Sequence, residues 1–263
     1  MEQFYLGLVK SWTRYGNSYL LGARNTLLIS LVGTFFGCLI GFAVGVLRTL
    51  PISPKDKWQK RFLNRLLNIF LSTYVELFRG TPMIVQSVFI YYGARIAFNL
   101  SMSMWTAAFF IVSINTGAYM AETVRGGILS VDQGQTEGAK ALGMNHSQTM
   151  FLVLLPQAFR NIIPQIGNNF IVNIKDTSVL SVISITDLFF VHKSVVGSLY
   201  LYFESATITM VIYLTMTTTA AWALRHLEGR LDGPQHYDLA AIDTLAQTSG
   251  LLSYKAKGEV GHD

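Results

Sequence analysis

Apolar stretches alternate with short polar segments along this chain, and four of the stretches are long enough to cross a lipid bilayer. A hydrocarbon core of about 30 Å requires about 20 predominantly apolar helical residues. The four stretches cover residues 27–47, 102–121, 162–190 and 203–224. The pattern therefore predicts an all-α membrane protein.

A fifth stretch, residues 66–98, has the wrong length for one simple span. As a single helix it would be about 50 Å long, and Arg79, Gly80, Thr81 and Pro82 interrupt it. We expect residues 82–98 to be mostly intramembrane and residues 66–78 to be tilted or to lie along one face. The prediction is then five spans.

The first 24 residues are not a cleavable signal peptide, because Lys10, Trp12 and Arg14 interrupt any apolar core of the required length. Aromatic and apolar residues fall on roughly one helical face of this segment, which is typical of a helix lying at a membrane interface. These residues are Tyr5, Leu8, Val9, Trp12, Tyr15 and Tyr19. An aromatic-rich terminus without a membrane role is the alternative.

Lys and Arg collect on one side of the predicted membrane. Thirteen lie in the loop after the first span, in the loop after residue 121 and in the carboxyl-terminal tail, against five on the other side, with Arg79 and Lys175 treated as embedded. Cytoplasmic loops carry the excess of basic residues. The amino terminus is therefore predicted outside and the carboxyl terminus in the cytoplasm.

Composition excludes several classes of protein. Hydrophobic residues make up 51% of the chain and charged residues 13%, against about 25% charged in a typical soluble domain. The net charge of +5 is spread between apolar runs, without the basic and aromatic stripe of a nucleic-acid-binding protein. A single cysteine, Cys38, excludes a disulfide framework within the chain.

Four glycines recur at every fourth position of the first span: Gly33, Gly37, Gly41 and Gly45. Small residues at this spacing form one smooth helix face, which lets two membrane helices approach closely. The pattern indicates close packing within a bundle or a dimer and leaves the partner helix open. The general abundance of glycine in membrane helices is the alternative.

Polar and ionisable residues inside a membrane usually face a partner or a water-filled cavity, because exposing them to lipid costs about 3 kcal/mol each. Two predicted helices carry them, and we expect both helices to line a water-filled region. The first contributes Asn115, Tyr119 and Glu122, and the second contributes Asn169, Asn173, Lys175, Asp176, Thr177, Ser178 and Ser181.

Structural roles are open for the charged members of this set. Lys175 and Asp176 form either a mutually neutralised pair or two separate functional groups, because adjacent residues on a helix point about 100° apart. Glu122 either lines that region or pairs with Arg125, one turn further along the helix.

The loop between the third and fourth spans contains a spaced motif: Glu137, Gly138, Ala139, then Gly143, then Leu155 and Pro156. A short helix from residue 135 to 142 is predicted to end at Gly143, since glycine is suited to that position. Pro156 and Pro164 are expected to start or kink the next helix. An isolated loop of this kind would be interpreted as an ordinary surface helix.

The loop resembles the EAA loop of permease subunits in ATP-binding-cassette importers, with Gly138 where alanine is commoner. Residues 76–82, 115–126 and 175–178 resemble the polar amino acid branch of that family. The likeness extends over residues 15–230 and implies a five-helix type I importer fold. It divides the chain into an interfacial segment (1–24), a transmembrane domain (25–230) with a coupling loop (126–160), and a tail (231–263) without an assigned role.

The resemblance also implies partners. A second permease subunit, a pair of ABC ATPase subunits and an extracytoplasmic substrate-binding protein are expected, at a bacterial inner membrane. Polar amino acids are the expected substrates, and the resemblance implies that they pass between the permease halves along the two helices that carry the polar residues. The coupling helix, residues 135–150, would contact the ATPase, with Glu137, Gly138, Ala139, Gly143 and Pro156 as its key positions.

No enzyme site is predicted. The segment 134–140 lacks the spacing of a phosphate-binding loop, the five histidines lack metal-ligand spacing, and no cofactor is expected. A secondary transporter driven by an ion gradient is the main alternative, although the helical repeats common in that class are absent. A membrane scaffold or channel would not need the coupling loop.

Overall fold

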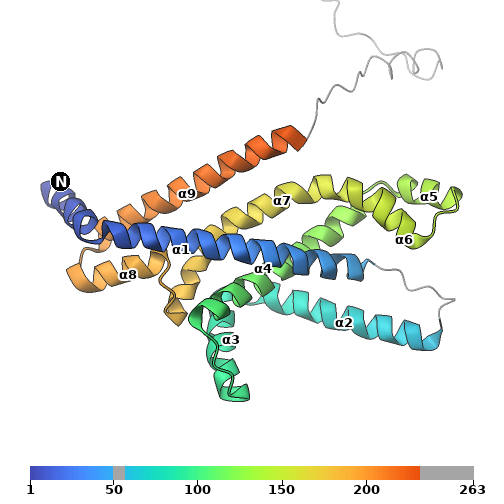
Figure 1. The fold of residues 1–263 in the computed structure, drawn as a ribbon, viewed down its shortest axis with the longest axis horizontal. Coiled ribbons are helices and arrows are strands. Elements are labelled where there is room, and N and C mark those ends of the chain that lie inside the picture. Colours follow the sequence, from blue (N-terminus) through green and yellow to red (C-terminus); the bar gives the residue numbers. More distant parts are fainter. Residues whose placement is uncertain (50–56, 232–263) are drawn as a thin grey trace, which may run out of the picture.

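The computed structural model describes residues 1–49 and 57–231, and every regular secondary-structure element in these residues is a helix (Figure 1). Lys55, Lys257 and the predicted tail beyond residue 231 lie outside the described residues. The α-helices are α1 (Glu2–Arg48), α2 (Trp58–Gly80), α3 (Met83–Phe98), α4 (Met104–Leu129), α5 (Gln133–Ala141), α6 (His146–Gln148), α7 (Leu155–Asp176), α8 (Leu188–Leu199) and α9 (Tyr202–Leu231). A π-helical turn, η1 (Thr149–Leu154), and a 3-10 helix, η2 (Thr177–Ile183), adjoin α7.

Helix α1 is continuous over 47 residues, so the predicted amino-terminal segment and the first span form one helix. At 1.5 Å per residue it is about 70 Å long, more than twice the hydrocarbon thickness. Its first part packs against α8 and α9 through Tyr19, which is fully buried. The hydroxyl of Tyr19 lies 2.6 Å from Ser205 Oγ.

The interruption predicted near Pro82 separates α2 from α3. Thr81 and Pro82 have extended backbone conformations, and proline lacks the N–H needed to continue the helical bonding. Gln86 holds the break in place, because its Nε2 donates to the carbonyls of Phe78 and Thr81, both at 2.9 Å. In Figure 1, α3 turns away from the direction of α2.

Helix α4 lies at the centre of the bundle and packs against α1 along most of its length. The glycine stripe of α1 faces α4. A Cβ atom at Gly37 would lie 2.5 Å from Thr116 Cβ, and one at Gly45 would lie 2.7 Å from Val124 Cβ. Real Cβ contacts are almost never this short, so the two helices approach as closely as they do only because these positions lack side chains. The partner of the stripe is therefore a helix of the same chain.

The span predicted for residues 162–190 is wrong as a single helix. Helix α7 begins earlier, at Leu155, ends at Asp176, and continues as η2 to Ile183. Ser184 then adopts a left-handed conformation with φ 64°, which ends the helix. Buried Asp187 caps α8 by accepting from the backbone N–H groups of Phe189 (3.2 Å) and Phe190 (3.0 Å). Apolar content alone does not reveal this break.

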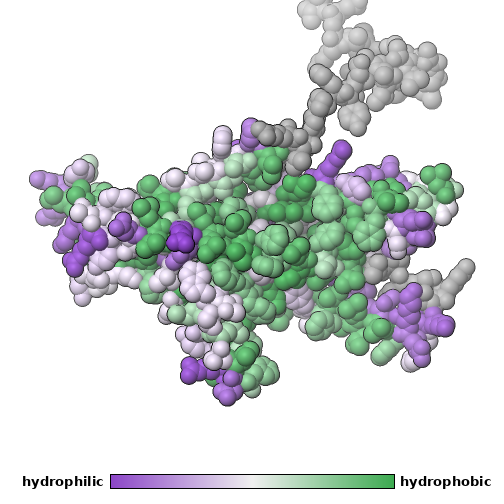
Figure 2. Space-filling model, viewed as in Figure 1, coloured by the Kyte–Doolittle hydropathy of each residue, from purple (hydrophilic) through white to green (hydrophobic). Residues whose placement is uncertain are grey.

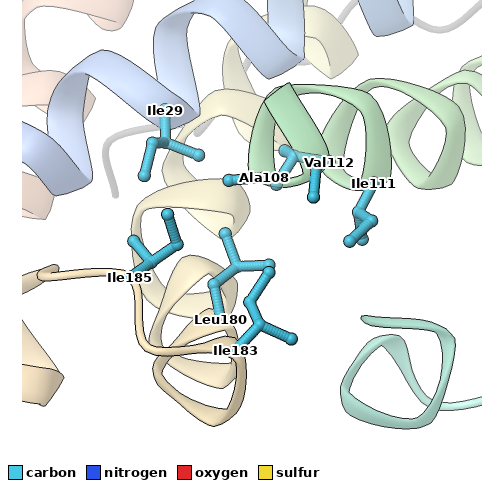
Figure 3. Packing of buried hydrophobic residues seen from close by; sticks show 8 residues of the cluster. Ile29, Ala108, Ile111, Val112, Leu180, Ile183 and Ile185 are labelled. Carbon is cyan, nitrogen blue, oxygen red and sulfur yellow. The ribbon is translucent and has the colours of Figure 1, made fainter. Parts of the chain in front are cut away.

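The main core forms where α1, α4 and η2 meet. Figure 3 shows Ile29, Ala108, Ile111, Val112, Leu180, Ile183 and Ile185 converging there. A second cluster joins α4 to η1 and α7. Figure 2 shows hydrophobic side chains over most of the bundle, with hydrophilic ones concentrated at its ends.

Within the described residues, α1 and α9 are each long and apolar enough to cross a membrane, and the bent pair formed by residues 146–183 and α8 is a third candidate. Helix α3 is apolar but has only 16 residues. Helix α4 carries Asn115, Thr116 and Glu122, which lower its apolar content. The predicted count of five spans is therefore not established by length and composition.

Candidate functional site

Helix α5 and the loop after it form a compact structure outside the main bundle, at the end where α4 finishes and α7 begins (Figure 1). Asp132 caps α5, since its Oδ1 accepts from Gly134 N at 2.8 Å. At the other end, Gly143 has φ 76°. The N–H of Gly143 donates to Lys140 O (2.9 Å), and that of Met144 donates to Ala139 O (3.1 Å). This pair of bonds is the Schellman motif, with glycine at the left-handed position.

The chain returns to the bundle through a second capped turn. Asn145 and Gln148 form a reciprocal capping box at α6, and η1 follows directly. Pro156 is the second residue of α7. Because proline has no N–H, the normal helical bond to the preceding turn is missing there, which is consistent with the wider π-helical turn that precedes it.

The coupling residues predicted from the sequence divide into an inner and an outer set. Ala139 is 4% exposed, and α5 packs on η1. Glu137 and Gly138 are exposed, and a Cβ atom at Gly138 or Gly143 would meet no atom within 4 Å. Leu142 is 83% exposed. The helix therefore presents an outward face that nothing in the described chain covers.

The polar residues of α4 have different environments. Asn115 is buried, and its Nδ2 donates to Gln86 Oε1 at 2.9 Å, which links α4 to α3. Tyr119 is 43% exposed, and the Arg79 guanidinium lies 5.7 Å from its ring centroid. Gln86 is a site residue that sequence reasoning missed, although a lone amide one turn after Pro82 in an apolar helix was a usable signal.

Glu122 lies in a cluster of three arginines. Its carboxylate pairs with Arg125 on the same helix and with Arg48 at 2.8 Å, while Arg79 lies 3.9 Å away. The side chains of Arg48 and Glu122 are 15% and 23% exposed. The cluster joins the ends of α1 and α2 to α4. The predicted pair with Arg125 is present, and Arg48 is a partner that the spacing of residues within one helix cannot reveal.

A buried hydrogen-bonded group connects three helices near the middle of the bundle. Asn173 of α7 donates through Nδ2 to Thr34 Oγ1 of α1 (2.8 Å) and Thr116 Oγ1 of α4 (2.9 Å). Thr177 is also buried and bonds to Ile174 O at 3.1 Å. In this single chain these residues hold helices together and do not line an open surface.

The neighbouring predicted pathway residues are more accessible. Asn169 is partly buried and lies 3.3 Å from Met120 Sδ. Lys175 and Asp176 are exposed, and no ion pair between them is found among the described residues. Lys175 and Ser178 line a cavity of about 380 Å³ between α7, η2, α8 and α9. The cavity also presents His192 and Tyr213, which the sequence analysis did not select.

The predicted residues therefore form three separate groups: the α5 loop, the charged and amide side chains of α4 with their partners, and the polar face of α7. Over the part of the chain that the structure describes, no three His, Cys, Asp or Glu side chains are grouped as metal ligands.

Comparison with known proteins identifies relatives over most of the chain. It is 36% identical over 211 residues to the glutamine transport system permease protein GlnP of Escherichia coli K12, covering 80% of this chain and 91% of the relative. It is 34% identical over 217 residues to the L-cystine transport system permease protein TcyB of Bacillus subtilis, covering 80% and 85% respectively.

Two solved structures are similar in fold. An amino acid ABC transporter crystallised with histidines matches with a TM-score of 0.74 and 34% identity, covering 84% of this chain and 97% of that one. The MetNI methionine ABC transporter matches with a TM-score of 0.69 and 20% identity, covering 82% and 97%. The resemblance to importer permeases found in the motifs is confirmed.

The family match spans the segments that carried the resemblance. Residues 57–233 match the family described as binding-protein-dependent transport system inner membrane component. These residues contain the α2–α3 break, the charged cluster of α4, the α5 loop and α7. The chain belongs to the family of binding-protein-dependent transport system inner membrane components.

Proposed function

We propose that the chain is the permease subunit of an ATP-driven importer of polar amino acids. Its membrane helices form the translocation pathway, and the α5 loop receives the movement of a separate ATPase subunit. The observation that carries the proposal is the outward face of α5, with Glu137 and Gly138 exposed and open space beside Gly143. A rigid, capped helix with an uncovered face suits docking into a groove of a soluble partner.

The structure of the loop supports transmission as well as docking. Ala139 is buried on the inner side of α5, and η1 joins this contact directly to α7. A displacement of α5 is therefore passed to the helix that carries Asn169, Lys175 and Asp176. Helices packed to crystal-like density transmit strain instead of absorbing it.

The polar face of α7 and the end of α4 form the pathway in this proposal. Lys175 and Ser178 border a cavity that is large enough for an amino acid. The ammonium group of Lys175 could donate a charge-assisted hydrogen bond to the carboxylate of that amino acid. Asn173 and Thr177 have a supporting role, since both are buried in contacts within the chain. The relatives named for glutamine and cystine support polar amino acids as the substrate class.

The complete importer includes a second permease subunit, two ATPase subunits and an extracytoplasmic binding protein. Five spans, an amino terminus outside and a carboxyl terminus in the cytoplasm belong to the same proposal. The positions of the basic residues support this orientation.

Reconstitution of the complete importer in liposomes tests the proposal. Replacing Gly138 by leucine should reduce ATP-dependent uptake at least tenfold while leaving the helical content of the permease unchanged, because the new side chain enters open space. Gly93→Leu is the matched control, since Gly93 on α3 also has open space around its Cβ position. Unchanged uptake by Gly138→Leu would remove the coupling role of α5.

Two further experiments test the translocation pathway and the alternative of a secondary transporter. Lys175→Gln should change the concentration dependence of uptake without changing assembly. Uptake by the permease alone, driven by an imposed ion gradient in the absence of ATPase and ATP, would favour a secondary transporter and overturn the proposal.

A further inference from the structure

The first half of α2 exposes both basic and large apolar side chains. Trp58, Phe62 and Phe70 are 76%, 58% and 71% exposed, and Leu63, Leu66 and Ile69 are also exposed. Lys57, Arg61 and Arg65 are exposed as well. Only the second half of the helix contributes buried residues, Leu71 and Val75. The first three turns therefore project from the core without a covering element in the described chain.

The two kinds of side chain occupy adjoining strips of the helix surface. Trp58, Phe62, Leu66 and Ile69 follow a spacing of four, four and three residues, which places them on one helical face. Arg61 and Arg65 are one turn apart and lie together beside that face. Figure 2 shows hydrophilic and hydrophobic side chains next to each other at this end of α2.

Arg61 and Arg65 have no acidic residue near them on their own helix segment. No Asp or Glu occurs from residue 57 to residue 75. The ion pairs recorded for the described residues involve Arg48, Arg79 and Arg125, and none includes Arg61 or Arg65. Negative charge from outside the chain would supply the missing counter-charge.

We propose that residues 57–70 of α2 bind the headgroups of anionic phospholipids at the cytoplasmic surface of the membrane. The guanidinium fork of arginine matches phosphate oxygens, and aromatic side chains such as Trp58 and Phe62 reside at the boundary between acyl chains and headgroups. An acidic soluble protein would satisfy the arginines and leave the apolar face in water. A lipid satisfies both faces at once.

Tryptophan quenching by brominated lipids tests this site in the full-length chain. A variant with Trp12, Trp105 and Trp222 changed to phenylalanine retains Trp58 as the sole reporter, one turn from Arg61. In mixed vesicles, brominated phosphatidylglycerol should quench Trp58 more strongly than brominated phosphatidylcholine. The double change Arg61→Gln and Arg65→Gln should lower the relative affinity for phosphatidylglycerol by about tenfold to thirtyfold.

The matched control is Arg14→Gln with Arg24→Gln, which removes the same charge from exposed positions of α1 and should leave the quenching of Trp58 unchanged. Native mass spectrometry of the chain with all four tryptophans should show the same loss of bound phosphatidylglycerol. Equal quenching by both lipids would overturn the proposal. Absence of quenching by either lipid would also overturn it and indicate a protein partner instead.

Discussion

Glycine has opposite surroundings in two regions of this molecule. In the seam between α1 and α4, a Cβ atom at Gly41 would lie 2.8 Å from the backbone nitrogen of Ala121, and Gly37 and Gly45 are equally confined. In the α5 loop, a Cβ atom at Gly138 or Gly143 would meet nothing within 4 Å. The seam therefore requires glycine for space, whereas the loop has space to spare.

The contrast separates two physical reasons for one residue type. In lipid, the hydrophobic effect contributes little to the association of two helices. The close approach of α1 and α4 provides van der Waals packing instead. Gly143 is required for its backbone conformation, since φ 76° is unfavourable for residues with a Cβ atom. Neither reason applies to Gly138, where the proposed docking surface is the remaining explanation.

The largest effect is expected in the seam. Gly41→Val should destabilise the folded permease by about 3 kcal/mol or more, because the added methyl groups would meet backbone atoms of α4 that cannot move independently. Thermal unfolding in detergent, followed by circular dichroism, measures the change.

Gly93→Val adds the same side chain to α3 in open space and should alter the unfolding temperature much less than Gly41→Val. Similar losses in the two variants would show that helix propensity, and not the distance between α1 and α4, sets the cost.

An intermediate effect is expected for the buried amide next to the seam. Asn173→Leu should cost about 1–2 kcal/mol, because it leaves the hydroxyls of Thr34 and Thr116 without their bonds. Thermal unfolding again provides the measurement. If a triple variant that also carries Thr34→Val and Thr116→Val is no more stable than Asn173→Leu alone, the hydrogen-bonded group contributes less than its geometry indicates.

The smallest effect on global stability is expected at Gly143. Gly143→Val should weaken the end of α5 locally by about 1–2 kcal/mol, which speeds hydrogen exchange at the Met144 amide bonded to Ala139 O. Gly143→Asn should retain most of the protection, because asparagine tolerates the left-handed conformation. Equal exchange in both variants would mean that side-chain size, and not φ, governs this turn.

Local signals predicted much of the fold. The break at Pro82 follows from its missing N–H, and the end of α5 at Gly143 follows from glycine's access to positive φ. Membrane helices were recognisable because apolar stretches of about 20 residues have few other uses. The family motifs combined such local signals, and the comparisons confirmed the family.

Contacts between residues far apart in the chain were harder to predict from the sequence. The partner of Glu122 on α1, Arg48, is 74 residues away in the chain, and no periodicity within α4 points to it. The bend between η2 and α8 was missed because residues 162–190 are apolar enough to read as one span. Buried Asp187, which caps α8, was placed inside the predicted span 162–190 and was not recognised as a helix cap.

The sequence by itself determined that the chain is helical and membrane-embedded, that Gly33, Gly37, Gly41 and Gly45 form one face, and that a capped helix precedes Gly143. These properties depend on hydrophobicity, helical period and backbone preference, which are local. Only the tertiary structure decided that α4 receives the glycine face, that Asn173 is buried among threonines, and that the outer face of α5 remains uncovered. Such outcomes depend on which helices meet, and helix packing is set by shape complementarity between segments far apart in the chain.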